Sequence, residues 1–185
     1  MDNSSKLYGY WRILMWGGAA ALLSLPALAM RFFPDSGVNW SGGDFAVMGA
    51  MLLIACAAVE IGSRMSSNLP YRAGVIVAVG TAFLTVWVNL AVGMIQGEGN
   101  PMNLVFLGVI GIALFGAFGV RFAARGMAIV MATAAIAQVA IAIFVAIAGL
   151  DKLYTAVLIG LFALPWLLSA GLFQIAAKQK GMATA

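Results

Sequence analysis

The side chains with the clearest potential for chemistry are polar residues that lie inside long apolar stretches. Thr81, Thr85 and Asn89 follow one another at four-residue steps, and Gly93 and Gln96 continue the series. Steps of four and three residues place side chains along one face of a helix. Polar groups at membrane depth are costly and mark helix contacts or solute paths. The stripe is therefore a candidate substrate-binding surface.

A second amide, Gln138, lies near the middle of another apolar stretch, among alanines at helical spacing. One interpretation is a hydrogen bond between Asn89 and Gln138, or from either amide to a threonine or a backbone carbonyl. Such bonds between membrane helices contribute roughly 0.6 to 2 kcal/mol each. The other interpretation is a polar lining for a small ligand or an ion path. Both interpretations predict that the two amides point into the protein.

Glu60 is the acidic residue that comes closest to membrane depth. Arg64 follows four residues later, which is the favourable order for an ion pair on one helix. A pair whose long side chains reach toward the membrane surface is one interpretation. If Glu60 instead faced the interior alone, it would be a candidate for cation or proton binding. The candidate substrate-binding residues are thus Thr81, Thr85, Asn89, Gln138 and Glu60.

The residue types that catalysis and metal binding usually need are scarce. The chain has no histidine, one cysteine (Cys56) and 11 scattered methionines. Without histidine, Ser-His-Asp chemistry, imidazole proton shuttling and typical zinc sites are excluded. No acidic residue lies at mid-depth to couple transport to a cation. We therefore predict no catalytic residue, no metal, no cofactor and no enzymatic activity.

Composition places these residues in a membrane protein. Hydrophobic residues make up 64% of the chain and charged residues 9%, and the mean hydropathy is +1.05. Soluble domains have roughly 25% charged residues. Apolar runs of about 20 residues span the hydrocarbon core as helices. The sequence predicts an all-α, single-domain, polytopic membrane bundle of six transmembrane helices, at 11–30, 45–62, 73–96, 102–120, 126–150 and 153–177.

Local signals support several of these boundaries. Ser41 and Asp44 have the spacing of a capping box, and Asn100 followed by Pro101 suits a helix start. Asp151 can cap the sixth span. Pro26 and Pro165 interrupt the first and sixth spans, and each frees a backbone carbonyl and can kink its helix. A broken helix can line a cavity in a transporter, although harmless packing is the alternative.

The distribution of basic residues predicts the orientation. Eight of the ten fall on the side that holds both termini: Lys6, Arg12, Arg64, Arg72, Arg121, Arg125, Lys178 and Lys180. The positive-inside rule then puts both termini in the cytoplasm, so the basic excess needs no nucleic acid to explain it. Ala27-Leu28-Ala29 resembles a signal-peptidase site, but the first apolar run is long for a signal peptide, and we expect it to be retained as a span.

The stretch from Tyr71 to Gln138 contains YRAGVIVAVGTAFLTVWVNLAVGMI, then NPMNLVFLGV, then RFAARGMAIVMATAAIAQ. It resembles a family of small, multi-span bacterial inner-membrane proteins with no assigned activity. The resemblance covers about a third of the chain and includes Trp87 and Asn89. It implies a bacterial inner membrane and a helical bundle, and it supplies no catalytic residues.

Three functions remain open from the sequence. The first is an accessory or structural subunit of a membrane complex, whose partners are the lipid bilayer and other membrane-protein subunits or further copies of the chain. The second is a small permease or channel with a polar path lined by the third and fifth spans. The third, an intramembrane enzyme, lacks a nucleophile-base pair. The sequence favours the first.

Overall fold

The structure is a computed structural model that describes the backbone of residues 3–182 and the side chains of residues 10–182. The side chain of Lys6, predicted to be one of the cytoplasmic basic residues, lies outside this description. The chain divides into two compact units, which we call unit 1 (Met1–Ile61) and unit 2 (Gly62–Ala185).

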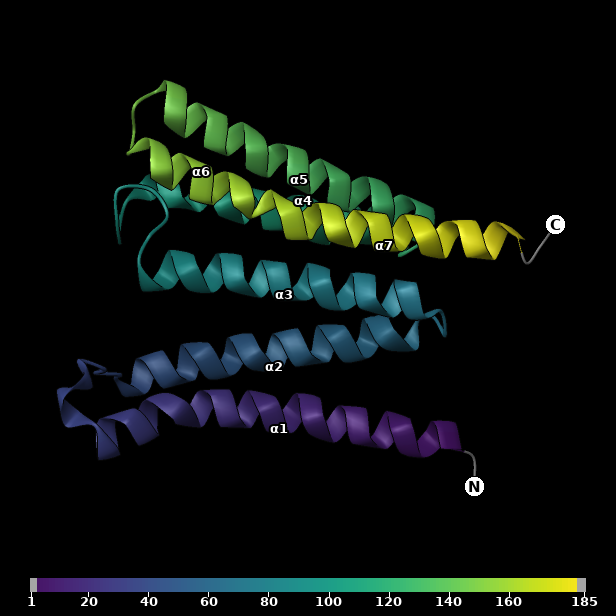
Figure 1. Cartoon of the computed structure of the whole chain (residues 1–185), viewed down its shortest axis with the longest axis horizontal. Coiled ribbons are helices and arrows are strands. Elements are labelled where there is room, and N and C mark those ends of the chain that lie inside the picture. Colours follow the sequence, from purple (N-terminus) through teal and green to yellow (C-terminus); the bar gives the residue numbers. More distant parts are fainter. Residues whose placement is uncertain (1–2, 183–185) are drawn as a thin grey trace. The chain divides into compact units, whose positions relative to one another are not determined.

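Unit 1 consists of two long helices and their connection (Figure 1). α1 spans Asn3–Phe32, the short 3-10 helix η1 spans Pro34–Ser36, and α2 spans Gly42–Arg64 and so runs into the start of unit 2. Pro26 is accommodated within α1 without ending it. The predicted capping box is confirmed, because the Ser41 N–H donates to Asp44 Oδ2 at 2.7 Å and the Asp44 N–H donates to Ser41 Oγ at 3.3 Å.

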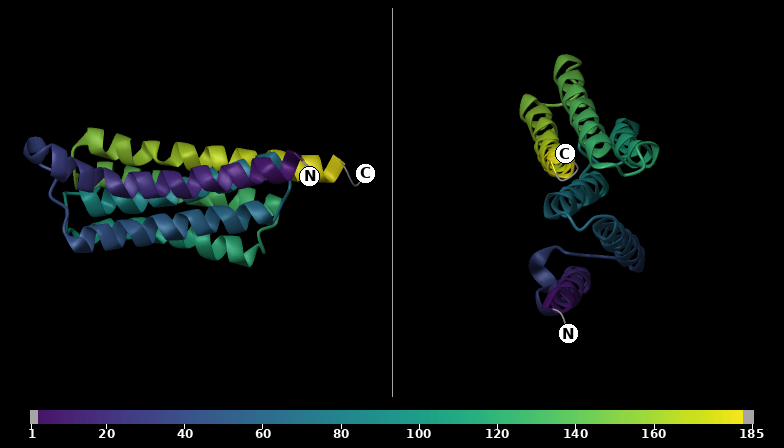
Figure 2. Two further views of the ribbon diagram at one scale, coloured as in Figure 1. Left: turned by 90° about the horizontal axis from the view of Figure 1, so that it is seen from below. Right: turned by 90° about the vertical axis from the view of Figure 1, so that its right-hand side faces the viewer.

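Unit 2 is a bundle in which α5 is central. Its elements are α3 (Leu69–Ala91), η2 (Pro101–Leu104), α4 (Val105–Gly119), α5 (Ala124–Ile147), α6 (Leu153–Leu161) and α7 (Ala163–Met182). α5 packs against α4, α6 and α7, and α3 packs against α7. Figure 2 shows these helices lengthwise and end-on.

The core of unit 2 combines large side chains with very small ones. Trp166 and Phe173 are fully buried in one apolar cluster together with Ala134 and Ala135 of α5, and Phe106 is fully buried in a second cluster. Small residues let helix backbones approach closely in lipid, where apolar surface alone provides little attraction between helices. Gly116 on α4 shows the same principle, since a Cβ at this position would lie only 2.7 Å from Cγ1 of Val130 on α5.

The prediction of six apolar helices in an all-α fold is confirmed. Six helical segments are long and apolar enough to cross a membrane: Tyr10–Phe32, Gly42–Arg64, Leu69–Ala91, Pro101–Gly119, Ala124–Ile147 and Leu153–Met182. No strand occurs among residues 3–182. This architecture is consistent with a multi-pass integral membrane protein.

The predicted end of the third span needs correction. The third span was expected to reach Gln96, but α3 ends at Ala91 because Gly93 adopts φ +65° and turns the chain out of the helix. A Cβ at Gly93 would lie 2.1 Å from the carbonyl oxygen of Gly97, so only glycine fits this turn. The sixth span is divided at Phe162 into α6 and α7, close to Pro165, which was predicted to interrupt it.

Candidate functional site

The stripe on α3 faces inward as predicted, but its hydrogen-bond donors bind their own helix. Thr81 Oγ1 donates to the Val77 carbonyl at 2.6 Å, and Thr85 Oγ1 donates to the Thr81 carbonyl at 2.8 Å. Asn89 Nδ2 donates to the Thr85 carbonyl at 3.1 Å. Thr81 and Thr85 are buried, and Asn89 Oδ1 is buried without a hydrogen-bond partner among the described residues. Asn89 Oδ1 is thus the atom of the stripe that makes no hydrogen bond within the described part of the chain.

Gly93 and Gln96 do not belong to this face, because both lie beyond the end of α3. Gln96 has φ +54° and is exposed in the connection between α3 and α4. The helical spacing that linked them to Thr85 and Asn89 therefore overextended the stripe by more than one turn.

Gln138 on α5 is the most completely buried amide of unit 2, with no exposed surface. Its Nε2 donates to the Ile159 carbonyl on α6 at 3.0 Å, so the predicted bond from this amide to a backbone carbonyl is confirmed. The alternative bond between Asn89 and Gln138 is wrong, because each amide donates to a backbone carbonyl instead. Gln138 Oε1 has no partner within the described part of the chain.

The Ile159 carbonyl belongs to a discontinuity in the sixth span. The Phe162 N–H also donates to it, at 3.2 Å, in the tight turn that ends α6. Pro165 has no N–H with which to bind the carbonyl four residues earlier, and this favours a break just before it. Gln138 therefore binds the backbone where the sixth span is interrupted. Pro165 was the only sequence signal for this feature, and it did not identify Ile159.

Ser169 bonds α7 to α3, and this contact is a reference point from which the depths of the polar groups on the two helices can be compared. Its Oγ donates to the Gly74 carbonyl at 2.8 Å, and Ser169 is fully buried. The two helices are antiparallel, and a helix rises about 1.5 Å per residue. Thr85 then lies about 16 Å from the Ser169 contact and Ile159 about 15 Å from it, in the same direction. Thr85 and the Gln138–Ile159 bond are thus at nearly the same depth.

Two buried polar residues of α7 were missed by the sequence reasoning. Ser169 makes the contact just described, and Trp166 is fully buried with its Nε1 unpartnered among the described residues. Both lie in an apolar run in which hydroxyl and indole groups are common on either face. Only the packing of α3 and α5 around α7 distinguishes them.

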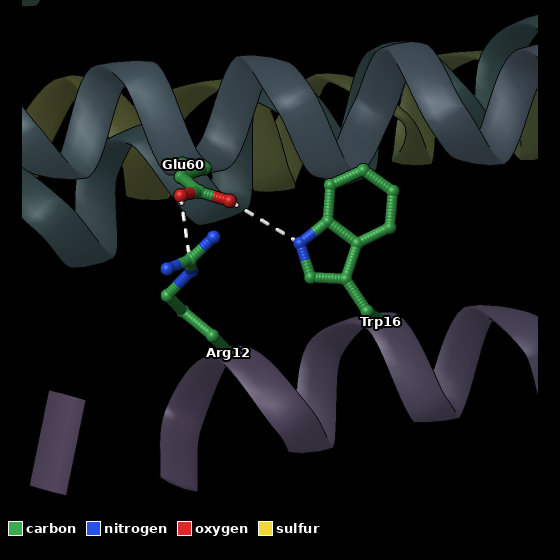
Figure 3. Close-up of polar contacts among 3 residues, drawn as sticks. All are labelled: Arg12, Trp16 and Glu60. Carbon is green, nitrogen blue, oxygen red and sulfur yellow. Dashed lines mark hydrogen bonds and ion pairs between the residues drawn. The ribbon is translucent and has the colours of Figure 1, made fainter. Parts of the chain in front are cut away.

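In unit 1, Glu60 binds two side chains of α1 (Figure 3). Its Oε1 lies 3.0 Å from Arg12 Nε, and its Oε2 accepts a hydrogen bond from Trp16 Nε1 at 3.2 Å. Arg12 and Trp16 are four residues apart and so lie on one face of α1. The Glu60 side chain is 12% exposed. Glu60 is therefore not alone, and its predicted pairing with Arg64 stays a prediction.

A polar junction closes one end of unit 2. The Gln96 N–H donates to Asp151 Oδ2 at 2.8 Å, and Gln96 Nε2 donates to the Leu150 carbonyl at 2.6 Å. Asn100 Nδ2 donates to Gln96 Oε1 at 2.7 Å. Two hydrogen bonds lower the pKa of the Asp151 carboxyl: the larger contribution comes from the Gln96 N–H and the next from the Lys152 N–H. Asp151 was predicted to cap the sixth span, but the N-cap of α6 is Lys152, and no side chain makes a capping hydrogen bond there. Asp151 instead ties the 92–104 connection to the start of α6.

The side chain of Asn103 makes hydrogen bonds to the backbone of the 92–104 connection. Its Oδ1 accepts from the Ile95 N–H at 2.8 Å, and its Nδ2 donates to the Ile95 and Gly97 carbonyls at 3.2 and 2.9 Å. These bonds bring Met94 and Ile95 into an apolar cluster with Phe106. The 92–104 connection is therefore packed and bonded rather than loosely exposed.

The opposite end of unit 2 carries most of its basic residues. Asn68 Nδ2 donates to Gln179 Oε1 at 2.8 Å, and Tyr71 Oη donates to the Phe122 carbonyl at 2.9 Å. These contacts bring together the segments that carry five of the predicted cytoplasmic residues: Arg72, Arg121, Arg125, Lys178 and Lys180. The described residues contain no group of three or more Cys, Asp or Glu side chains that could hold a metal ion.

In comparisons with known proteins, no family model, no curated protein and no solved structure matches the chain.

Proposed function

We propose that this chain is a non-enzymatic subunit of a larger membrane assembly, in which α1 contacts a neighbouring protein within the bilayer. The observation that carries the proposal is the exposure of the apolar part of α1. None of the residues in its most apolar window is buried in the structure. α1 nevertheless has the composition of a helix that packs against another helix.

The composition in question is a run of small residues, Gly17 to Ala21. A Cβ added at Gly17 or Gly18 would meet nothing within 4 Å, so both positions are open. In lipid, small residues favour helix association because they let the backbone of a second helix approach closely, and a helix that faces only lipid gains no such contact from them. α1 is therefore suited to receive a helix of another subunit or of a second copy.

The test is native mass spectrometry after gentle detergent extraction of the full chain from its source membrane. We expect a stoichiometric protein partner with the wild-type chain and its loss in Gly17→Leu, because a leucine would block close approach. Gly108→Leu is the matched control, since Gly108 on α4 is also exposed with open space at its Cβ. A wild-type chain that is monomeric, or a partner retained equally by both variants, would contradict the proposal.

We also infer that the chain resides in a bacterial inner membrane with both termini in the cytoplasm. The support is the charge distribution, with five basic residues in the segments that meet at the Asn68–Gln179 end of unit 2. Single cysteines placed at Ser66 and Glu98 in a Cys56→Ala background separate the two sides of the membrane. In intact cells, a membrane-impermeant thiol reagent should label the Glu98 position and spare the Ser66 position; the reverse pattern would overturn the orientation.

The second candidate function is a small permease. The resemblance to small multi-span inner-membrane proteins, which have no assigned activity, is compatible with this function. The specific observation behind it is the interrupted sixth span at the buried Gln138, since discontinuous helices line solute sites in many transporters. In vesicles, Asn89→Leu should lower solute flux if Asn89 lines the path. Unchanged flux together with altered stability would remove Asn89 from any transport role.

A further inference from the structure

The most unusual polar atom of unit 2 is the side-chain oxygen of Gln138. The residue has no exposed surface, its Nε2 is used by the Ile159 carbonyl, and its Oε1 has no partner among the described residues. A buried carbonyl oxygen left without a donor costs about 1–3 kcal/mol. Native proteins usually meet such a cost with a bound molecule, most often water.

The position of Gln138 makes the membrane interior the relevant environment. It is about 21 Å along α5 from Ala124 and about 14 Å from Ile147, so it lies well away from both ends of the helix. Lipid cannot donate a hydrogen bond at this depth. A donor for Oε1 must therefore be a molecule held inside the protein.

The chemistry of the surroundings restricts that molecule. The groups at the same depth are Thr85, whose hydroxyl hydrogen is used by Thr81, and the backbone of Ile159. The charged residues of α3, α5, α6 and α7 lie near the helix ends in the sequence. A cation at this depth would have no counter-charge, which is costly in a membrane interior. The molecule is therefore neutral.

A second acceptor lies further along the bundle. Asn89 Oδ1 is also buried without a partner in the described part of the chain. Counting from the contact between Ser169 and Gly74, Asn89 is about 22 Å along its helix, which places it about 7 Å beyond the depth of Ile159. Both open groups are acceptors, so both call for a donor.

We propose that Gln138 Oε1, beside the break between α6 and α7, is the acceptor of a binding site for a small, uncharged hydrogen-bond donor, and that Asn89 Oδ1, about 7 Å away in depth, is a separate acceptor for the same class of molecule. Water is the smallest member of this class, and small polyols and amides such as glycerol and urea are larger members. The proposal specifies the class of ligand for the second candidate function, the small permease. Binding at the site does not depend on that function, because a site can be occupied without flux; only transport of the ligand rests on it.

The experiment is isotope-edited infrared spectroscopy of the full chain in lipid vesicles, with 13C in the side-chain carbonyl of its glutamines. The chain has four, and subtraction of the spectrum of Gln138→Met isolates the band of Gln138. Gln138→Glu provides a second subtraction if the methionine variant does not fold. Gln174→Met is the matched control, because Gln174 is exposed on α7.

Each result has a defined meaning. A Gln138 carbonyl band at the low frequency of a hydrogen-bonded amide in solute-free buffer identifies water as the ligand. A band that moves to low frequency only after glycerol or urea is added identifies a small solute. A band that stays at the high frequency of a free carbonyl under all three conditions overturns the proposal. Flux of the same solutes through the vesicles is measured separately, so loss of the transport function leaves the occupancy result intact.

Discussion

Units 1 and 2 are built from equally apolar helices, but they are held together in different ways. In unit 2, large side chains such as Trp166 and Phe173 fill a continuous core, and the helix α5 contacts three others. In unit 1, no residue in the apolar window of α1 is fully buried, and the described side-chain bonds from α1 to α2 come from Arg12 and Trp16 to Glu60. High hydropathy therefore says that a helix enters a membrane, and it does not say whether the helix packs against its own chain.

The largest test of this difference is Gly93→Ala in unit 2. The new Cβ would lie 2.1 Å from the Gly97 carbonyl oxygen and would occupy a backbone conformation with φ +65°. We expect a loss of about 3 kcal/mol or more in the free energy of unfolding, measured by detergent titration. Gly99→Ala is the control, because Gly99 has φ +78° with open space around it, and should cost only about 1–2 kcal/mol. Equal effects of the two changes would show that the close contact in the 92–104 connection is unimportant.

A smaller effect is expected from Gly116→Ala, which tests close packing between α4 and α5. The added methyl would lie 2.7 Å from Val130 Cγ1, and overpacking of this kind costs about 1–3 kcal/mol. Gly119→Ala, with open space at the same helix end, should be neutral or slightly stabilising. The measurement is again unfolding in mixed micelles. A neutral Gly116→Ala would mean that unit 2 is packed as loosely as unit 1.

In unit 1, Glu60→Gln should have a local effect of about 1 kcal/mol or less, because the Arg12 partner is 47% exposed and partly screened. The contact between α1 and α2 should weaken, which spin labels on the two helices would report as a broader distance distribution. Trp16→Phe, which removes only the indole hydrogen bond, should broaden it less. If neither change alters the distribution, the polar cluster does not hold α1 in place.

The smallest effect concerns Asp151 and pH. Its pKa is lowered in the folded state by the Gln96 and Lys152 N–H groups, so its contribution to stability is complete above the ordinary pKa of about 3.9. That contribution is lost as the pH falls through the lowered pKa. The protection factor of the Gln96 amide, which is the intrinsic exchange rate divided by the observed rate, should therefore fall below about pH 4, and Asp151→Asn should remove this pH dependence. Exchange with the same acid dependence in both proteins would assign it elsewhere.

The sequence predicted the helices of both units well because membrane span length and backbone satisfaction allow few alternatives. It also identified the capping box at Ser41 and Asp44 and the burial of Thr81, Thr85 and Gln138. It failed where one residue changes the backbone course, as at Gly93, since a glycine inside a helix and a glycine that ends one look alike in the sequence. Partners far apart along the chain, such as Gln138 with Ile159 or Glu60 with Trp16, depend on packing that spacing along one helix does not encode.

The three hydrogen bonds of Asn103 have a practical consequence for anyone who labels this protein. An epitope inserted between Ile95 and Asn103 would separate the amide from the Ile95 and Gly97 groups that it holds and would pull Ile95 out of its apolar cluster. The connection between α1 and α2 offers a better insertion point at Gly37, which is followed by exposed, irregular chain. Antibodies and fluorescent tags therefore belong at Gly37, and the short connection near Asn103 should be left intact.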